Sequence, residues 1–113
     1  MPETFGRLAE RVCREQGFEL LPSGARVPLS GGRSQVVAME QFEFQGRERL
    51  RLWTRIGPEE GLGNVRMEAA LRVNARLPHG AFGLRDGALV LGKTYALDEI
   101  DAEELEFALR FRA

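Results

Sequence analysis

Apolar residues recur at helical spacing near the amino terminus of the chain. They are Phe5, Leu8, Ala9, Val12 and Cys13. Thr4 precedes them and can cap a helix, because its hydroxyl accepts a hydrogen bond from an exposed backbone amide. Gly17 follows them, and glycine commonly ends a helix because it adopts the left-handed conformation without strain. The pattern therefore predicts a first helix between Thr4 and Gly17.

A second helical segment, residues 65–76 with Asn64 as its cap, is apolar on two sides. One stripe holds Val65, Ala69, Val73 and Leu77, and the other holds Met67, Leu71 and Ala75. A helix that is apolar on two faces usually has two neighbours. In so small a chain we expect the second neighbour to be another copy of the protein. The candidate dimer-interface residues are Val65, Met67, Ala69, Leu71 and Val73, and the pattern leaves open which stripe faces the second copy.

Alternating polar and apolar positions predict the strands. Residues 25–29 form a short strand in this interpretation, and Pro28 favours a sheet edge because it lacks an amide donor. Residues 36–56 have the pattern of a long hairpin, and a second hairpin turns at residues 86–87, an Asp-Gly pair typical of tight turns.

The end of the chain predicts a third helix. Asp101 and Glu104 have the spacing of a capping box, and apolar residues at core spacing follow. They are Leu105, Ala108 and Leu109. The predicted order is α-β-β-β-α-β-β-α, an α+β fold with a twisted antiparallel five-stranded sheet flanked by helices. We expect a single domain over residues 1–113.

The register of the long hairpin decides which side chains share a face. A three-residue loop, residues 45–47, places Phe42 opposite Leu50, so that apolar side chains meet on one face. A two-residue loop instead places Phe42 opposite Arg49. The three-residue loop is the prediction.

With this register, the second face of the hairpin carries a candidate partner-binding patch. Trp53, the sole tryptophan, has Arg51 and Arg55 beside it, and Val37 and Met39 lie across from it. Tryptophan, methionine and arginine are enriched in the centres of protein interfaces. Two alternatives remain: a helix or arginine stems cover the patch, or the arginine–tryptophan pattern contacts nucleic acid.

Composition narrows the class of protein. Apolar residues make up 43% of the chain and charged residues 29%, which is typical of a globular domain. The formal net charge of −1 gives no general attraction to nucleic acid or to anionic lipid. No apolar run reaches the length of a membrane span, and the first residues lack the basic and apolar regions of a signal peptide. For a bacterial source, we therefore expect a soluble cytoplasmic protein.

Signals for chemistry are weak. Residues 87–94 match the phosphate-loop pattern G-x-x-x-x-G-K-[ST], but the intervening Ala-Leu-Val-Leu indicates a buried strand rather than a loop. His79 is the only histidine and lies in a Pro-His-Gly turn. Cys13 is the only cysteine and lies on the apolar face of the first helix, which excludes an intramolecular disulfide. We predict no catalytic, cofactor-binding or metal-binding residues, no cofactor and no enzymatic activity.

Four segments carry a resemblance to a known family. They are residues 71–74 (Leu-Arg-Val-Asn), 80–87 (Gly-Ala-Phe-Gly-Leu-Arg-Asp-Gly), 89–91 and 95–101. With the order of elements, they resemble the class I type III secretion chaperones and the YbjN-like proteins. The resemblance implies a small homodimer with the middle helix at its interface. The chain departs from the chaperones in being arginine-rich and only mildly acidic.

The resemblance also implies a function. Secretion chaperones bind extended segments of a partner by strand addition and in apolar grooves, whereas YbjN-like proteins are linked to regulation. We expect a non-enzymatic homodimeric module that holds an extended segment of an unidentified partner protein. The alternatives are a small regulatory protein that acts through a signalling partner and an RNA-binding module. We expect no membrane partner.

Overall fold

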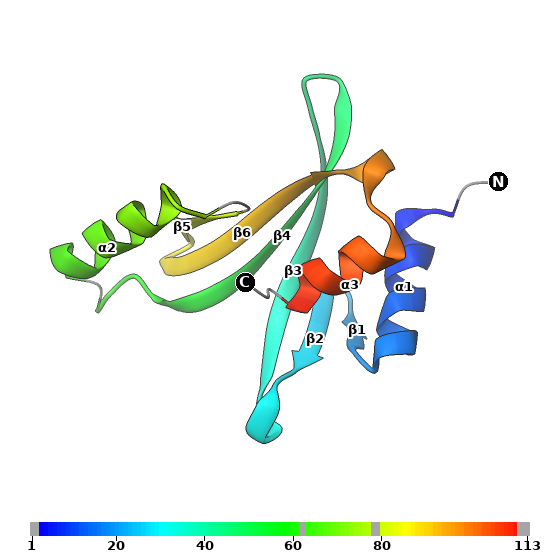
Figure 1. Ribbon diagram of the computed structural model, residues 1–113, viewed down its shortest axis with the longest axis horizontal. Helices are drawn as coiled ribbons and strands as arrows, with labels where there is room; N and C mark the ends of the chain where they lie inside the picture. The colour runs from blue at the N-terminus through cyan, green and yellow to red at the C-terminus, as the bar shows by residue number, and fades with distance from the viewer. Residues whose placement is uncertain (1–2, 62, 78–79, 111–113) are drawn as a thin grey trace.

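The computed structural model describes residues 3–61, 63–77 and 80–110. Within them, six strands form one antiparallel sheet in the order β1-β2-β3-β4-β6-β5, and three α-helices accompany it (Figure 1). The helices are α1 (Phe5–Gln16), α2 (Asn64–Asn74) and α3 (Ala102–Arg110). The strands are β1 (Glu19–Leu21), β2 (Gly24–Pro28), β3 (Ser34–Phe44), β4 (Arg47–Pro58), β5 (Ala81–Arg85) and β6 (Ala88–Ala96). Two 3-10 turns, η1 (Ser30–Gly32) and η2 (Leu97–Glu99), complete the chain.

The α+β architecture agrees with the sequence prediction, but the sheet has six strands rather than five. The additional strand is β1, which turns back at Pro22-Ser23 and pairs with residues 24–26 of β2. The predicted edge position of β2 is therefore wrong for its first half. Pro28 lies beyond the short β1 and pairs only with Ser34 of β3, so its missing amide costs no hydrogen bond on the β1 side.

Helices α1 and α3 pack together against one face of the sheet and enclose the core (Figure 1). The predicted limits of α1 are confirmed. The Arg7 amide donates to Thr4 Oγ1 over 3.2 Å, and Gly17 has a φ of +74°. The helix side contributes Leu8, Val12, Leu105 and Leu109 to the core, and the sheet side contributes Ala25, Val27, Val37, Leu50 and Leu52.

The β3–β4 hairpin has a two-residue turn, and the predicted three-residue loop is wrong. Gln45 and Gly46 form the turn with φ values of +54° and +74°, and Phe42 lies opposite Arg49. Positive φ at both central residues gives the tight turn whose twist matches that of paired strands. This register directs one apolar set into the core and turns the aromatic residues and arginines outward.

Helix α2 begins one residue earlier than the sequence suggests. Gly63 is its N-cap and has no side chain to contribute, so the prediction that Asn64 caps the helix is wrong. At the other end of the chain, Asp101 Oδ1 accepts a hydrogen bond from the Glu104 amide over 2.8 Å, which confirms the predicted cap of α3. The Asp86-Gly87 turn is also confirmed, with φ values of +49° and +77°.

Candidate protein-binding surfaces

The sheet face opposite α1 and α3 carries alternating aromatic residues and arginines. We call it the arginine–aromatic face and define it by Phe42, Phe44, Arg49, Arg51, Trp53 and Arg85. The guanidinium carbons lie 5.5 Å (Arg49 to Phe44), 4.4 Å (Arg51 to Phe42) and 4.4 Å (Arg85 to Trp53) from the ring centroids. These distances place each cation over a ring, where the electron-rich ring face attracts it.

Arg85 joins this face to β3 through Glu40. Its Nη1 donates to Glu40 Oε1 over 2.8 Å, and its Nη2 donates to the other carboxylate oxygen. The hydrogen bonds from Arg85 hold the pKa of the Glu40 carboxyl below its usual value, against the opposing effect of partial burial. Arg85 is thus fixed by a bidentate ion pair as well as by the Trp53 ring.

The predicted partner-binding patch is divided between the two faces of the sheet. Val37 is fully buried in the core, and it lies opposite Thr54, while Met39 lies opposite Leu52 on the same inner face. The assignment of Val37 and Met39 to the face of Trp53 is therefore wrong, because it depended on the three-residue loop. Arg51, Trp53 and Arg55 alternate with these inner residues and lie on the outer face, where a role in partner binding stays a prediction.

Helix α2 is the second surface of interest, because none of its residues is buried. It extends from the sheet beside β5 (Figure 1). The relative exposure of Val65 is 80% and that of Leu71 is 70%, so both apolar stripes reach solvent. All five candidate interface residues lie on this helix, and only Met67 among them is half-buried. Their role in dimer formation stays a prediction.

Asn74 attaches the end of α2 to the edge of the sheet. Its side-chain amide donates to the Phe82 carbonyl oxygen over 3.1 Å and accepts from the Phe82 amide over 2.6 Å. A neighbouring strand would satisfy the same two backbone groups. Asn74 therefore occupies one hydrogen-bonding position on the outer edge of β5.

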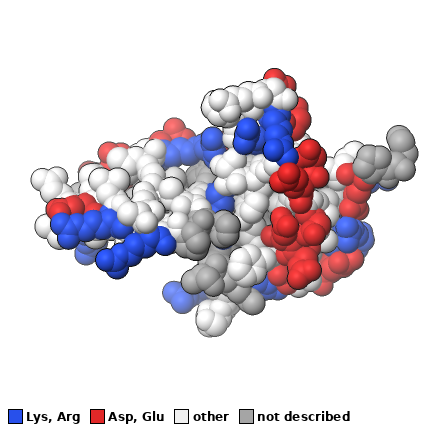
Figure 2. Space-filling model, turned by 45° about the horizontal axis from the view of Figure 1, so that its top comes forward, with Lys and Arg blue, Asp and Glu red and all other residues white. Residues whose placement is uncertain are grey.

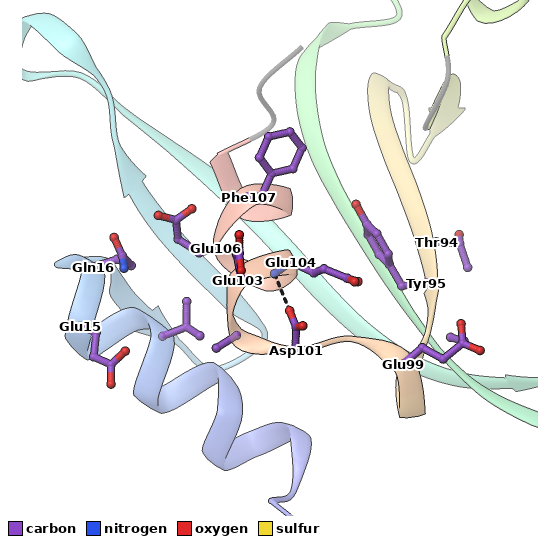
Figure 3. A pocket seen from close by; sticks show the side chains of 13 residues that line it. Glu15, Gln16, Thr94, Tyr95, Glu99, Asp101, Glu103, Glu104, Glu106 and Phe107 are labelled. Carbon is purple, nitrogen blue, oxygen red and sulfur yellow. Dashed lines mark hydrogen bonds between the residues drawn. The ribbon is translucent and has the colours of Figure 1, made fainter.

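A third surface, which we call the acidic groove, lies between α1, the end of β6, η2 and α3 (Figure 3). Its volume is about 1150 Å³. Six carboxylates line it: Glu15, Glu99, Asp101, Glu103, Glu104 and Glu106. Its apolar lining consists of Val12, Tyr95, Ala96, Ala102 and Phe107. Figure 2 shows acidic side chains gathered at the end of the molecule where α1 and α3 lie, and basic ones at the α2 end.

Some of these carboxylates have partners within the chain. Glu99 pairs with Arg47 over 2.8 Å, and Glu106 pairs with Arg110 over 3.5 Å. Glu15, Glu103 and Glu104 form no ion pair within residues 3–61, 63–77 and 80–110.

The pKa of Tyr95 reflects both the burial and the negative charge in the groove. Burial raises the pKa of its hydroxyl, and the charge of Glu104 raises it further. The groove therefore combines an apolar surface with excess negative charge.

The sequence pattern does not predict the groove. It predicts only that Asp101 and Glu104 cap the third helix. The available signal was the density of carboxylates, since residues 98–106 hold six acidic side chains. Glu15 lies far from them in the sequence and joins them only because α1 packs against α3.

Residues with potential for chemistry do not converge in the described part of the chain. Burial raises the pKa of the Cys13 thiol, and residues 88–94 of the phosphate-loop pattern lie in β6, as predicted. No group of three or more potential metal ligands occurs among the described residues. His79 lies outside them. None of the described helices is long and apolar enough to span a membrane.

Comparison with known proteins shows the fold. The chain is similar to the type III secretion chaperone SycH of Yersinia pestis, solved in complex with a stable fragment of YscM2, with a TM-score of 0.66 and 19% identity. The alignment covers 95% of this chain and 92% of that chain. It is also similar to the HopA1–SchA chaperone–effector complex, with a TM-score of 0.59 and 14% identity over 92% of this chain and 84% of that one. The fold is therefore that of the secretion chaperones.

Similarity in sequence was found to part of a longer protein. The chain is 36% identical over 92 residues to leucine-rich repeat-containing protein 56 of Rattus norvegicus, which covers 76% of this chain. The chain spans 17% of the length of that protein. No family model matches the chain, and a YbjN-like relationship stays a prediction.

Proposed function

We propose that the protein is a non-enzymatic, homodimeric binding module that holds an extended segment of a partner protein. Large apolar side chains left exposed on the described surface carry this proposal. They are Leu20, Leu29, Val36, Phe44, Ile56, Val65, Leu71, Val73, Leu84 and Phe107. Exposed apolar side chains that gather on one element commonly mark protein interaction sites, and three of these lie on α2.

The distribution of these residues favours two kinds of contact. Val65, Leu71 and Val73 lie on α2, a helix with no buried residue, which suits a second copy of the chain. Phe107 lies in the acidic groove. The likeness to chaperones that were solved with partner proteins supports a protein as the second ligand.

Grooves are better suited to the partner than the edge of β5. Asn74 already occupies the backbone groups of Phe82 there, and strand addition needs those groups free. The partner segment in this proposal therefore lies against side chains rather than extending the sheet at β5.

The self-interface is tested by Leu71→Asp. A carboxylate on the exposed α2 surface should leave the fold intact and convert the dimer to a monomer, because a buried unpaired charge is costly. Sedimentation velocity measures the oligomeric state, and Leu20→Asp, an equally apolar exposed position on β1, is the matched control. If Leu71→Asp were still a dimer, the interface would not be formed by α2.

Partner binding is tested by affinity capture of the tagged protein from its own cell extract, with Trp53→Ala and Phe107→Ala in parallel. The captured protein is then purified, and its binding segment is mapped with fragments. Retention in moderate salt supports docking through apolar surface. Steep salt dependence with competition by RNA would favour the RNA-binding alternative, and capture of a folded signalling protein without a linear binding segment would favour the regulator.

A further inference from the structure

We propose that the acidic groove selects a segment in which basic residues flank an apolar one. The inference rests on the proposed function and specifies the chemistry of the partner segment. It combines three features of the groove: its size, its exposed aromatic lining and its unbalanced charge.

The size of the groove fits a polypeptide. Small-molecule sites usually have volumes of ~300–1,000 Å³, and the groove exceeds that range at about 1150 Å³. It is lined by residues from both α1 and α3 and from the end of β6 (Figure 3). A segment of chain can therefore lie in it along several residues.

The lining offers a place for an apolar side chain. Phe107 is 49% exposed although it lies on α3 beside the core residues Leu105 and Ala108. Tyr95 faces the same space from β6 and is half-buried (Figure 3). Two aromatic rings that border one groove provide the kind of apolar contact that anchors interface residues.

The charge of the groove favours a basic ligand. Its lining residues include six carboxylates and no lysine or arginine. The nearby cations come from outside the lining: Arg47 and Arg110 pair with two of the carboxylates, and the Lys93 ammonium lies 5.9 Å from the centroid of the Phe107 ring. Asp101 caps α3. Glu103 and Glu104 gain some stabilisation from the positive end of α3, but that effect does not extend to Glu15.

Glu15 is the carboxylate that α1 contributes to the groove. The charge of Arg11, one turn earlier, interacts favourably with it, although the Arg11 guanidinium is hydrogen-bonded to Glu3. Glu15 lies in the last turn of α1, where the negative end of the helix disfavours a carboxylate. Its position on the groove wall is consistent with a cation of the ligand. A lysine or arginine side chain of the ligand would be attracted to the carboxylates that line the groove.

The test uses three fluorescein-labelled peptides of equal length. The first contains arginine, leucine and alanine; in the second each arginine is replaced by glutamine, and in the third by glutamate. Fluorescence polarisation measures their affinity for the full-length protein. The basic peptide should bind at least about tenfold more tightly than the glutamine peptide, and the glutamate peptide should bind most weakly.

The site is identified with matched variants. Glu103→Gln/Glu104→Gln should lower the affinity for the basic peptide by about tenfold. Glu43→Gln/Glu48→Gln, which makes the same change in net charge on exposed residues of the β3–β4 hairpin, should leave its affinity unchanged. Phe107→Ala should lower the affinity for both the basic and the glutamine peptide. Circular dichroism verifies that each variant is folded.

Three results would overturn the inference. Equal affinity for the three peptides, or no binding of the basic one, removes the charge preference. Equal weakening by the groove and hairpin variants assigns the effect to net charge alone. If Glu103→Gln/Glu104→Gln were monomeric, the acidic groove would be occupied by a second copy of the chain rather than by a partner segment.

The proposed function is judged separately. Capture of a partner whose mapped segment binds normally to Glu103→Gln/Glu104→Gln would refute binding in the acidic groove and leave the proposed binding module intact. Failure of the proposed function would instead appear as a protein that is monomeric and captures no partner.

Discussion

Asn74 provides a direct test of how α2 is held on the sheet. Its side chain makes two hydrogen bonds to the backbone of Phe82, with lengths of 3.1 and 2.6 Å. Each such bond contributes ~0.5–1.5 kcal/mol to stability. Asn74→Ala removes both and should lower the free energy of unfolding by ~1–3 kcal/mol. Urea denaturation followed by circular dichroism measures this change.

Local measurements separate the loss of these bonds from a general loss of stability. In Asn74→Ala the Phe82 amide should exchange hydrogen faster than core amides such as that of Leu52, because only the former loses its acceptor. The outer edge of β5 also becomes available for pairing between molecules, so concentration-dependent association should increase.

The matched control is Asn64→Ala. Asn64 is exposed at the opposite end of the same helix, so its replacement should change stability little. Equal stability of the wild type and Asn74→Ala, or unchanged exchange at Phe82, would refute the interpretation that Asn74 fastens α2 to β5. Equal destabilisation by the two substitutions would show that the loss does not depend on the contact with Phe82.

Three further predictions concern single side chains. Gln45→Asn should stabilise the protein by ~0.5–1 kcal/mol in thermal unfolding, because asparagine tolerates the positive φ of this turn position better than glutamine does; an unchanged melting temperature would contradict this. Glu40→Gln should lower stability by ~0.5–1 kcal/mol at neutral pH. Since Arg85 lowers the folded-state pKa of Glu40, this difference is fully present above the ordinary value of 4.5 and should disappear as the pH falls below it; a difference that persists in acid would exclude the ion pair as its cause. Cys13, which is buried and has a raised pKa, should react with a thiol reagent at mildly alkaline pH only after denaturation; rapid labelling of the native protein would contradict its burial.

The sequence predicts elements whose ends carry local signals. Thr4 and Gly17 delimit α1, and Asp101 begins α3, because capping residues satisfy backbone groups within a few positions of themselves. The Asp86-Gly87 turn is recognised for the same reason, since both residues accept a positive φ. These features depend on short stretches of chain, and the structure agrees with them.

The register of the β3–β4 hairpin does not follow from local signals. Gln45 has no preference for a positive φ, so the turn lacks the Asn-Gly or Asp-Gly sequence that marks such turns. Both faces of β3 are also apolar in part, with Val37 on one side and Phe42 on the other. Period-two alternation therefore cannot decide which face the helices cover. Because the predicted turn is one residue too long, the prediction assigns Val37 and Met39 to the wrong face of the sheet.

The candidate binding surfaces depend on contacts between distant parts of the chain. Glu15 reaches the acidic groove only because α1 packs against α3. Arg85 of β5 bonds to Glu40 of β3 although β6 and β4 separate these strands in the sheet. Neither arrangement can be inferred from composition. The net charge of −1 is the sum over the whole chain, in which the carboxylates of the groove are balanced by arginines elsewhere, several of which lie over aromatic rings. Four guanidinium groups lie over aromatic rings, and one of them, that of Arg85, also pairs with a carboxylate, so the arginine content by itself does not indicate nucleic-acid binding.

The positions of α2 and the acidic groove have a consequence for stoichiometry. The helix lies at one end of a molecule whose longest extent is 50 Å, and the groove lies between α1 and α3 at the other end (Figure 1, Figure 2). A two-fold symmetric dimer formed through α2 would leave both grooves open and far apart. Titration of the basic peptide should then reach two peptides per dimer, with independent affinities. A ratio of one peptide per dimer would mean that the two grooves adjoin, which is incompatible with an interface formed by α2.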